Sequence, residues 1–290
     1  MQNGGSFGVL GGDRRQIAMA ESIAADGYSV SVYGFDNVSF SSGIIKSGLT
    51  ETVRNHKNII LPLPVTSDGI HLKMDYSKEQ VILNDDFAKL LRDKQVFGGK
   101  MEKLFQTSRL WDCINTHDFS LREEFAVKNA VPTAEGAIGI AIQEYPGTLN
   151  GSRCLVAGFG RIGKVLAWML RGIGAMVTVS ARKQADLAWI CSYGYSAVLT
   201  EHVGEGEYDI IFNTIPRQVF SHSVLRKMQY RPLLIDLASL PGGVDLQAAD
   251  EFGIRVIQAL SLPGKVAPKA AGEIIKETIF NILKEGHGFE

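Results

Sequence analysis

The sequence predicts an α/β protein of two domains, each built on an open parallel sheet, with the second domain of the Rossmann type and doubly wound. Three observations support this prediction. The 290 residues are enough for two hydrophobic cores. Short apolar runs alternate with helical periodicity in both halves. A G-x-G-x-x-G pattern at 158–163 lies between an apolar run and a helical run.

The predicted domain boundaries follow from these runs. We expect an N-terminal Rossmann-like domain over 1–130, a connecting helix over 131–148, a Rossmann domain over 149–262, and a C-terminal helix over 263–290 that packs back across the domain junction. Ligand sites often lie at domain interfaces, so the first domain is expected to contribute to substrate binding.

The first half is expected to open with a strand over 7–10, a turn at 11–13, a helix over 14–26 and a strand over 29–33. Further expected elements are strands at 58–61, 80–83, 95–97 and 112–116 and helices at 86–92 and 101–109. An open parallel sheet is the simplest arrangement of these elements.

Pro132 divides the predicted connection between the domains. A helix over 121–129 is expected to end before it, and a second helical run covers 133–143. The second half then has six strands, the number in a doubly wound domain, at 153–157, 176–180, 196–199, 209–214, 233–237 and 255–258. A long helix over 267–285, with Ile275 and Ile279 on one face, closes the chain.

The glycines at 158–163 have the spacing of a dinucleotide fingerprint. Gly158 is expected in the tight turn, Gly160 where the backbone approaches a pyrophosphate, and Gly163 where helix and strand pack closely. Arg161 and Ile162 open the helix, whose N–H groups and dipole favour an anion. The sequence therefore predicts a dinucleotide site here.

The residues after the second strand of this domain favour NADP over NAD. NAD enzymes place a carboxylate there to accept bonds from the ribose hydroxyls, whereas this chain has Ser180, Arg182 and Lys183. A hydroxyl and two cations can bind a 2′-phosphate through charge-assisted hydrogen bonds. The alternative interpretation is that these residues form a solvated basic loop that binds no phosphate. NAD is the less favoured cofactor.

Two further loops at the carboxyl ends of strands are expected to contact the cofactor, because ligands of doubly wound sheets bind there. The expected contacts are Asn213, Thr214 and Pro216 in one loop and Leu237, Ala238 and Ser239 in the other. Asp236 ends an apolar run, where a carboxylate is costly unless it is paired. Two interpretations stay open for Asp236, a structural carboxylate bound by loop amides and a catalytic residue.

A possible anion grip precedes the first helix. Arg14 and Arg15 oppose the helix dipole in the first turn, whereas Asp13 suits the N-cap. Gly12 leaves the backbone N–H groups open to a ligand. We therefore expect Gly12, Asp13, Arg14 and Arg15 to bind a substrate carboxylate or a phosphate, against the alternative of two solvated arginines.

The remaining substrate and catalytic candidates are two histidines of the first domain and a loop before the last helix. His71 and His117 lie near predicted strand ends of the first domain and could act as acid or base, although a lone histidine is more often structural. A loop before the last helix is expected to line the substrate cleft, unless it is a plain turn and helix start. Its candidate residues are Pro263, Gly264, Lys265 and Lys269.

Composition and charge exclude several classes of protein. The net charge of −1 gives no bulk attraction to nucleic acid or to an anionic membrane, and no apolar run reaches the length of a membrane span. Cys113, Cys154 and Cys191 are odd in number and widely separated, which fits a reducing cytoplasm. The six histidines show no ligand spacing, so no metal site is expected.

Several of these segments together resemble the family of bacterial dipicolinate synthase A subunits over essentially the full length. The segments are Gly11 to Asp13 with Arg15 and Gln16, 131–136 with 141–143, 158–163, 213–216, 236–239 with 241–243, and 262–264 continuing to 271–272. The resemblance implies oxidation of dihydrodipicolinate, a small dicarboxylate, to dipicolinate with NADP during sporulation. It also implies the cytoplasm of the mother cell and a flavoprotein-like partner, the B subunit of dipicolinate synthase.

Thr133 and Glu135 lie in a segment that the resemblance covers, and they are carried over as substrate-cleft residues. Without the resemblance, the residues fit two other functions. One is an NADP-dependent dehydrogenase of another small hydroxy or amino acid, and the other is a non-catalytic cofactor-binding partner subunit. The sequence leaves open whether the chain forms a homo-oligomer.

Overall fold

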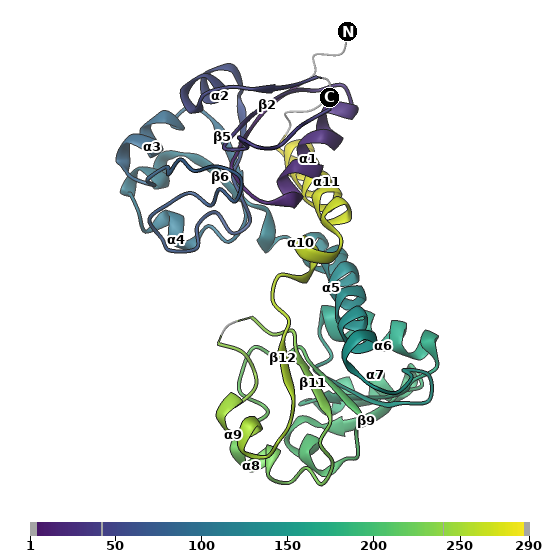
Figure 1. Cartoon of the computed structure of the whole chain (residues 1–290). Helices are drawn as coiled ribbons and strands as arrows, with labels where there is room; N and C mark the ends of the chain where they lie inside the picture. The colour runs from purple at the N-terminus through teal and green to yellow at the C-terminus, as the bar shows by residue number, and fades with distance from the viewer. Residues whose placement is uncertain (1–4, 42, 240, 287–290) are drawn as a thin grey trace. The chain divides into compact units, whose positions relative to one another are not determined.

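The chain forms two compact units in the computed structural model, which describes residues 5–41, 43–239 and 241–286. The first unit comprises Met1–Asn129 and Ala267–Glu290, and the second comprises Ala130–Val266. Helix α5 (Glu123–Glu144) runs through the boundary between them. Figure 1 shows both units, and each is described below by itself.

The first unit is built on a six-stranded parallel sheet of order β3-β2-β1-β4-β5-β6. Its strands are β1 (Ser6–Leu10), β2 (Ser29–Tyr33), β3 (Ile44–Lys46), β4 (Asn58–Ile60), β5 (Gln95–Gly98) and β6 (Asn115–Asp118). Its helices are α1 (Arg14–Ala25), α2 (Leu49–Asn55), α3 (Asp85–Leu90), α4 (Glu102–Phe105) and α11 (Pro268–Glu285), with short 3-10 turns at Arg109–Cys113 and Phe119–Leu121.

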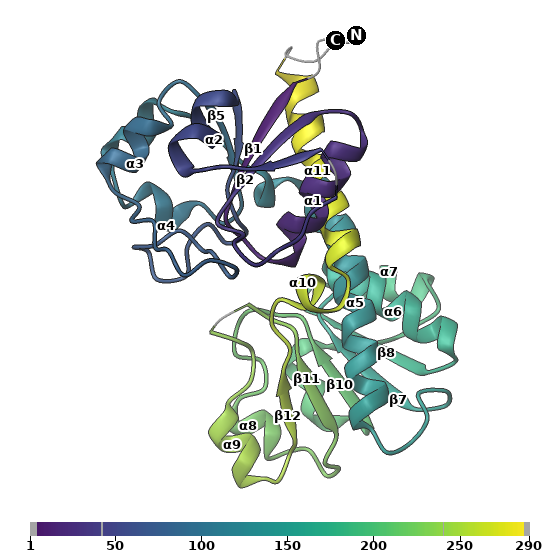
Figure 2. The same cartoon turned by 45° about the horizontal axis from the view of Figure 1, so that its top comes forward.

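Two apolar layers cover the first sheet. Helices α1 and α11 lie side by side on one face, as Figures 1 and 2 show, and bury Met19, Ile275 and Ile279 against the strands. Helices α2, α3 and α4 cover the other face. A Cβ on Gly272 of α11 would lie 2.7 Å from the carbonyl oxygen of Arg15, so a glycine there lets the two helix backbones approach closely.

The second unit repeats this topology with the order β12-β11-β10-β7-β8-β9. Its strands are β7 (Arg153–Ala157), β8 (Met176–Ala181), β9 (Ser196–Leu199), β10 (Ile210–Asn213), β11 (Leu233–Asp236) and β12 (Val256–Gln258). Its helices are α6 (Arg161–Ile173), α7 (Gln184–Ser192), α8 (His222–Leu225), α9 (Leu246–Glu251) and α10 (Leu262–Val266), and a 3-10 turn covers Thr200–Glu205. Residues of α5, α6 and α7 pack on one face of this sheet, and those of α8 and α9 on the other.

The predicted fold class is confirmed. In each sheet the strand order reverses between the first and fourth strands of the unit, β1 and β4 or β7 and β10. Ligands of doubly wound sheets bind in the crevice at this switch point, outside the carboxyl ends of the strands. Each unit therefore presents one such position, formed by the turns after β1 and β4 in the first unit and after β7 and β10 in the second.

Several predicted elements are wrong in detail. Residues 80–83 form only an isolated bridge between His71 and Ile82, and β3 replaces them as the sixth strand of the first unit. The predicted strand at 112–116 is shifted to β6, and the predicted helix at 101–109 is shortened to α4. Pro132 lies inside the continuous helix α5 instead of dividing two helices.

Candidate dinucleotide and anion sites

The glycine turn after β7 has the geometry that its spacing predicts. Gly158 has φ +106°, and a Cβ there would lie 2.5 Å from Thr214 Oγ1. A Cβ on Gly163 would lie 2.0 Å from the carbonyl oxygen of Gly158, which no side chain can satisfy without moving the backbone. A Cβ on Gly160, by contrast, would meet nothing within 4 Å. Two glycines are therefore needed by the protein itself, and Gly160 leaves open space at the start of α6.

The N-terminus of α6 is open to a ligand. Gly160 is its N-cap residue, and no side chain caps it. The first N–H groups of a helix have no partner within the helix, and together with the helix dipole they favour a phosphate. Arg161 and Ile162 follow in the first turn, with Arg161 exposed and Ile162 half-buried. An open glycine and an uncapped 13-residue helix fit the pyrophosphate of a dinucleotide.

Ser180 does not lie where the sequence analysis expected it. Its side chain is fully buried, and its hydroxyl accepts a hydrogen bond from the backbone N–H of Gly158 at 3.3 Å and from Thr200 Oγ1 at 3.4 Å. The expected contact with a 2′-phosphate is wrong, because strand β8 turns this side chain into the protein. Ser180 instead stabilises the glycine turn through its hydrogen bond with the N–H of Gly158.

Arg182 and Lys183 follow β8 and are both exposed. Lys183 is the N-cap residue of α7, and its side chain makes no cap hydrogen bond. From 180 to 183 the chain has no carboxylate, the group that would repel a 2′-phosphate. The two cations are therefore free to reach an anion beside the carboxyl end of β8.

Asp236 lies at the centre of a buried clamp. Its Oδ1 accepts hydrogen bonds from Asn213 Nδ2 at 2.8 Å and from the N–H of Ala238 at 3.1 Å, and its Oδ2 accepts one from the N–H of Gly243 at 3.1 Å. Asp236 is 2% exposed and Asn213 is fully buried. The structure therefore shows the carboxylate bound by loop amides that one interpretation expected, while a catalytic role of Asp236 stays an untested prediction.

This clamp shapes the loops after β10 and β11. Thr214 Oγ1 donates to the carbonyl of Ala157 at 2.9 Å, which joins the loop to the end of β7. Leu237 and Ala238 are buried, whereas Ser239 and Pro216 are exposed. Of the six cofactor contacts expected from these loops, the exposed or half-buried ones are Thr214, Pro216 and Ser239.

At the switch point of the first unit, Asp13 binds two cations. It accepts hydrogen bonds from Arg15 Nε at 2.9 Å and Arg15 Nη2 at 2.7 Å, and it pairs with Lys73 Nζ at 3.0 Å. Burial raises its pKa, but the hydrogen bonds and charge of Arg15 and the hydrogen bond from Lys73 outweigh burial and hold it well below its usual range. Arg15 also donates to the carbonyl of Leu63, after β4.

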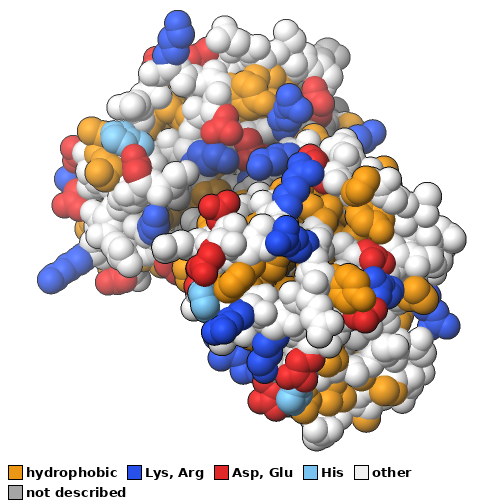
Figure 3. Space-filling view, turned by 60° about the horizontal axis from the view of Figure 1, so that its bottom comes forward, with side chains coloured by type: hydrophobic (Ala, Val, Ile, Leu, Met, Phe, Trp, Pro, Cys, Tyr) orange, Lys and Arg blue, Asp and Glu red, His pale blue; other side chains and the backbone are white. Residues whose placement is uncertain are grey.

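The four residues of the predicted anion site differ in how accessible they are, and binding of an anion by them stays a prediction. Arg15 is 7% exposed and bound within the protein, so it is not a solvated arginine, whereas Arg14 is exposed. Gly12 cannot offer its N–H to a ligand, because the carbonyl of Lys73 accepts it at 2.9 Å. Lys73 was missed, since its sequence neighbours give no signal and only folding brings it to Asp13. Figure 3 shows acidic and basic side chains interspersed on the face in view, in keeping with a net charge of −1.

The two histidines lie elsewhere in the first unit. His71 Nδ1 is 2.8 Å from Asp68 Oδ2 in a surface turn. His117 lies on β6, the edge strand, and its ring stacks on Phe97 with 5.2 Å between centroids. Burial lowers the pKa of His117. His117 lies two strands away from β4 at the switch point, and the assignment of either histidine as acid or base stays a prediction.

The remaining substrate candidates are divided between the units. Thr133 is buried and Glu135 exposed on α5, and both belong to the second unit. Pro263, Gly264 and Lys265 form most of the short helix α10 in that unit, where a loop was expected. Lys269 is exposed at the start of α11 in the first unit.

Comparison with known proteins identifies the family. The A subunit of dipicolinate synthase from Bacillus subtilis (strain 168) is 32% identical over 292 residues, which covers 98% of each chain. The chain belongs to the family of dipicolinate synthase A subunits. Residues 6–116 match the family model for the N-terminal domain of these A subunits. The predicted resemblance is confirmed.

Solved structures of this family have the same fold. The dipicolinate synthase A subunit of Bacillus halodurans matches with a TM-score of 0.86 and 29% identity, covering 98% of this chain and 99% of that one. The Bacillus subtilis structure matches with a TM-score of 0.85, covering 98% and 97%.

Two distant matches share the fold alone. A transhydrogenase from Sinorhizobium meliloti has a TM-score of 0.66 at 14% identity and covers 97% and 94%, and an L-alanine dehydrogenase has 0.61 at 13% and covers 96% and 90%. The fold is therefore one that dehydrogenases also use. Across residues 5–41, 43–239 and 241–286, no helix combines the length and the apolar character needed to cross a bilayer.

Proposed function

We propose that this chain oxidises dihydrodipicolinate to dipicolinate with a nicotinamide dinucleotide, in association with the second subunit of the synthase. The observation that carries the proposal is a dinucleotide cradle, formed by Gly158, Gly160 and Gly163 at the start of α6, in a chain of this family. When bound, the nicotinamide supplies the hydride acceptor. We place the reaction in the cytoplasm of the mother cell during sporulation, as the family resemblance implies.

The chemistry asks little of the protein beyond positioning. A dihydropyridine that gives a hydride to the nicotinamide and a proton to solvent becomes an aromatic pyridine, so the ring itself favours the products. The chain has to hold the planar dicarboxylate against the cofactor and keep its two negative charges paired. Of the acid or base candidates, Asp236 is held by three hydrogen bonds within the protein and His117 lies on the edge strand β6, in keeping with a reaction driven by orientation.

We assign one substrate carboxylate to Lys73. Its Nζ lies 3.0 Å from Asp13 and 3.7 Å from Asp75, and about a fifth of its side chain is exposed. Arg15 is held in place by Asp13 and by the carbonyl of Leu63, so it acts as a positioning residue that keeps Asp13 ionised and Lys73 oriented. A carboxylate at Lys73 would lie beside the switch point of the first unit.

A kinetic test of this assignment compares Lys73→Ala with Lys89→Ala. A charge-assisted hydrogen bond contributes about 1.5 to 3 kcal/mol, so losing it should lower kcat/KM roughly 10-fold to 100-fold, mainly through KM. Lys89 is a matched control, because its Nζ pairs with Asp86 on the surface of α3 in the same unit. Equal kcat/KM values for Lys73→Ala and the wild-type chain would remove Lys73 from the substrate site.

We further propose that NADP is the preferred cofactor, supported by exposed Arg182 and Lys183 and by the lack of a carboxylate at 180–183. Arg182→Ala should weaken NADP binding about tenfold and leave NAD binding nearly unchanged, because only NADP carries the 2′-phosphate. Calorimetric titration with each cofactor measures both affinities. An NAD preference in the wild-type chain would contradict this part of the proposal.

The activity itself is tested with freshly generated dihydrodipicolinate and NADP, with and without the purified second subunit. We expect the absorbance of reduced nicotinamide to appear, and to appear faster when the second subunit is present. Turnover of simple hydroxy or amino acids without that subunit would favour another dehydrogenase. A lack of any reduced nicotinamide in either mixture would leave a cofactor-binding subunit as the function.

A further inference from the structure

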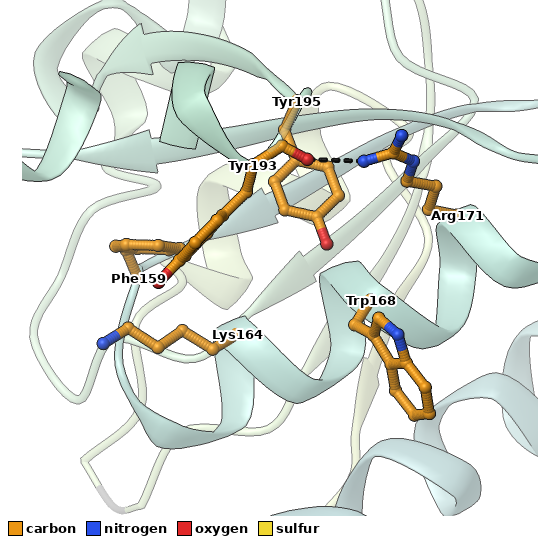
Figure 4. A pocket seen from close by; sticks show the side chains of 6 residues that line it. All are labelled: Phe159, Lys164, Trp168, Arg171, Tyr193 and Tyr195. Atoms are coloured by element: carbon orange, nitrogen blue, oxygen red, sulfur yellow. Dashed lines mark hydrogen bonds between the residues drawn. The ribbon is translucent and has the colours of Figure 1, made fainter. Parts of the chain in front are cut away.

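The second unit has a surface cavity of about 320 Å³ on the side of α6 and α7. Figure 4 shows the side chains that line it, with Lys164, Trp168 and Arg171 projecting from α6 and two tyrosines opposite. We call this surface the aromatic groove, and its residues are Phe159, Lys164, Trp168, Arg171, Tyr193 and Tyr195. None of these residues was assigned to the cofactor or the substrate above.

Helix α6 presents one stripe of side chains to this groove. Lys164, Trp168 and Arg171 are spaced i, i+4 and i+7, which places them on one face of a helix with about 10 Å between the first and the last. Trp168 lies between the two cations and is 67% exposed. The stripe therefore offers a large apolar side chain flanked by two positive charges.

The two cations of the stripe lie on aromatic rings. Lys164 Nζ is 5.0 Å from the centroid of Phe159, and the guanidinium of Arg171 is 5.7 Å from that of Tyr195. Arg171 also donates to the carbonyl of Tyr193. Among the described residues these ring contacts and the bond to the Tyr193 carbonyl are their polar contacts, and neither cation pairs with a carboxylate, so both positive charges are available to a partner.

Exposed aromatic side chains are concentrated here. The chain has three tryptophans, of which Trp111 is buried at 2% exposure, while Trp168 and Trp189 are 67% and 58% exposed on α6 and α7. Trp189, Tyr193 and Phe159 form a row with centroids 5.7 and 6.1 Å apart. Tryptophan, tyrosine and arginine are the residues that dominate binding energy at protein interfaces.

The charge of α6 decides between two protein occupants. The helix carries Arg161, Lys164 and Arg171 and no aspartate or glutamate. In a two-fold interface the same patch meets itself, so a second copy seated on α6 would set cations against cations. An acidic surface of a different protein meets the same charges favourably.

We propose that the aromatic groove docks an acidic surface of the second synthase subunit, which inserts an apolar side chain beside Trp168 and places carboxylates at Lys164 and Arg171. The identity of the partner rests on the proposed function. The docking geometry rests on the groove itself. Burial of Trp168 supplies the apolar contact with the partner. The two cations orient the partner and make its binding depend on salt concentration.

Calorimetric titration of the chain with the purified second subunit, at low and at physiological salt, tests this proposal. Trp168→Ala should weaken binding at least tenfold, because truncation of a central aromatic anchor has that effect. Arg171→Glu should weaken binding by a similar factor and reduce its dependence on salt. Two matched controls should bind like the wild-type chain. Tyr230→Ala removes another exposed aromatic ring, over which the guanidinium of Arg153 lies. Arg226→Glu reverses the charge of an exposed side chain outside the groove.

Three results would overturn the docking proposal: wild-type affinity in both groove variants, a wild-type chain that does not bind the second subunit, or a dimer of the chain that Trp168→Ala dissociates in sedimentation. The oxidation assay run on the same samples separates this proposal from the proposed function. Turnover without binding of the second subunit refutes only the docking. Binding that the groove variants weaken, without turnover, refutes only the function.

Discussion

The clamp at Asp236 predicts that this carboxylate stabilises the second unit and takes no part in the chemical step. Asp236→Asn is the informative change, because it keeps the size of the side chain. The amide can retain the bonds to Oδ1 from Asn213 and Ala238, but it then sets its own N–H₂ group against the N–H of Gly243. One buried donor loses its acceptor, and the two remaining bonds lose the charge that strengthens them.

The expected loss can be worked from these three bonds. A buried donor left without a partner costs about 1 to 3 kcal/mol, so we expect the free energy of unfolding to fall by about 2 kcal/mol. With a urea slope of about 2 kcal/mol per M, the unfolding midpoint should drop by about 1 M. Asp250→Asn, on the exposed side of α9, is the matched control and should leave the midpoint unchanged.

Far-ultraviolet circular dichroism during urea unfolding measures the midpoint, because the helices of the second unit contribute to its signal. Steady-state kinetics on the folded variant then measures kcat. A general acid or base contributes about 100-fold or more to the rate. An unchanged midpoint together with a 100-fold loss of kcat would refute the structural role and restore Asp236 as a catalytic residue.

Two further predictions concern the glycine turn and the carboxylate of the first unit. Gly163→Ala should abolish dinucleotide binding, measured by calorimetry, because its Cβ would lie 2.0 Å from the carbonyl oxygen of Gly158; near wild-type affinity would show that the turn is not the site. Asp13 has a lowered pKa, so its stabilising effect should be complete above about pH 4 and be lost as pH falls below that. Acid titrations of the wild-type chain and Asp13→Asn should therefore converge below pH 4, and parallel curves would contradict this.

The sequence predicted the parts of the site that depend on local backbone geometry. Gly158 and Gly163 occupy positions where a Cβ would collide with the chain, and such requirements repeat at fixed spacing in any dinucleotide turn. Six strands of the second unit were likewise visible as buried apolar runs. Local pattern and tertiary structure agree best for β7, β10 and β11, because these strands are buried on both faces of a parallel sheet.

The sequence did not predict the direction of single side chains or the contacts between residues far apart in the chain. Ser180 was expected to face a ligand, but strand alternation turns it inward toward Gly158. Lys73 and Asp13 are 60 residues apart in the sequence and meet only because the loops fold together. A periodic pattern of apolar residues gives no sign of such a contact. A continuous α5 was missed because Pro132 costs a helix interior about 3 kcal/mol, while Ala134, Ala137 and Ala141, all fully buried in the core of the second unit, hold the helix beyond it.

The placement of α11 has a consequence for synthesis of the chain. The first unit contains Met1–Asn129 but completes its apolar layer only with Ala267–Glu290, where Ile275 and Ile279 pack beside α1. The second unit is one continuous segment. On the ribosome the second unit therefore has all its residues first, and one face of the earlier-made sheet stays covered by α1 alone until the last helix emerges. We expect that interval to be the stage at which the nascent chain most needs a chaperone.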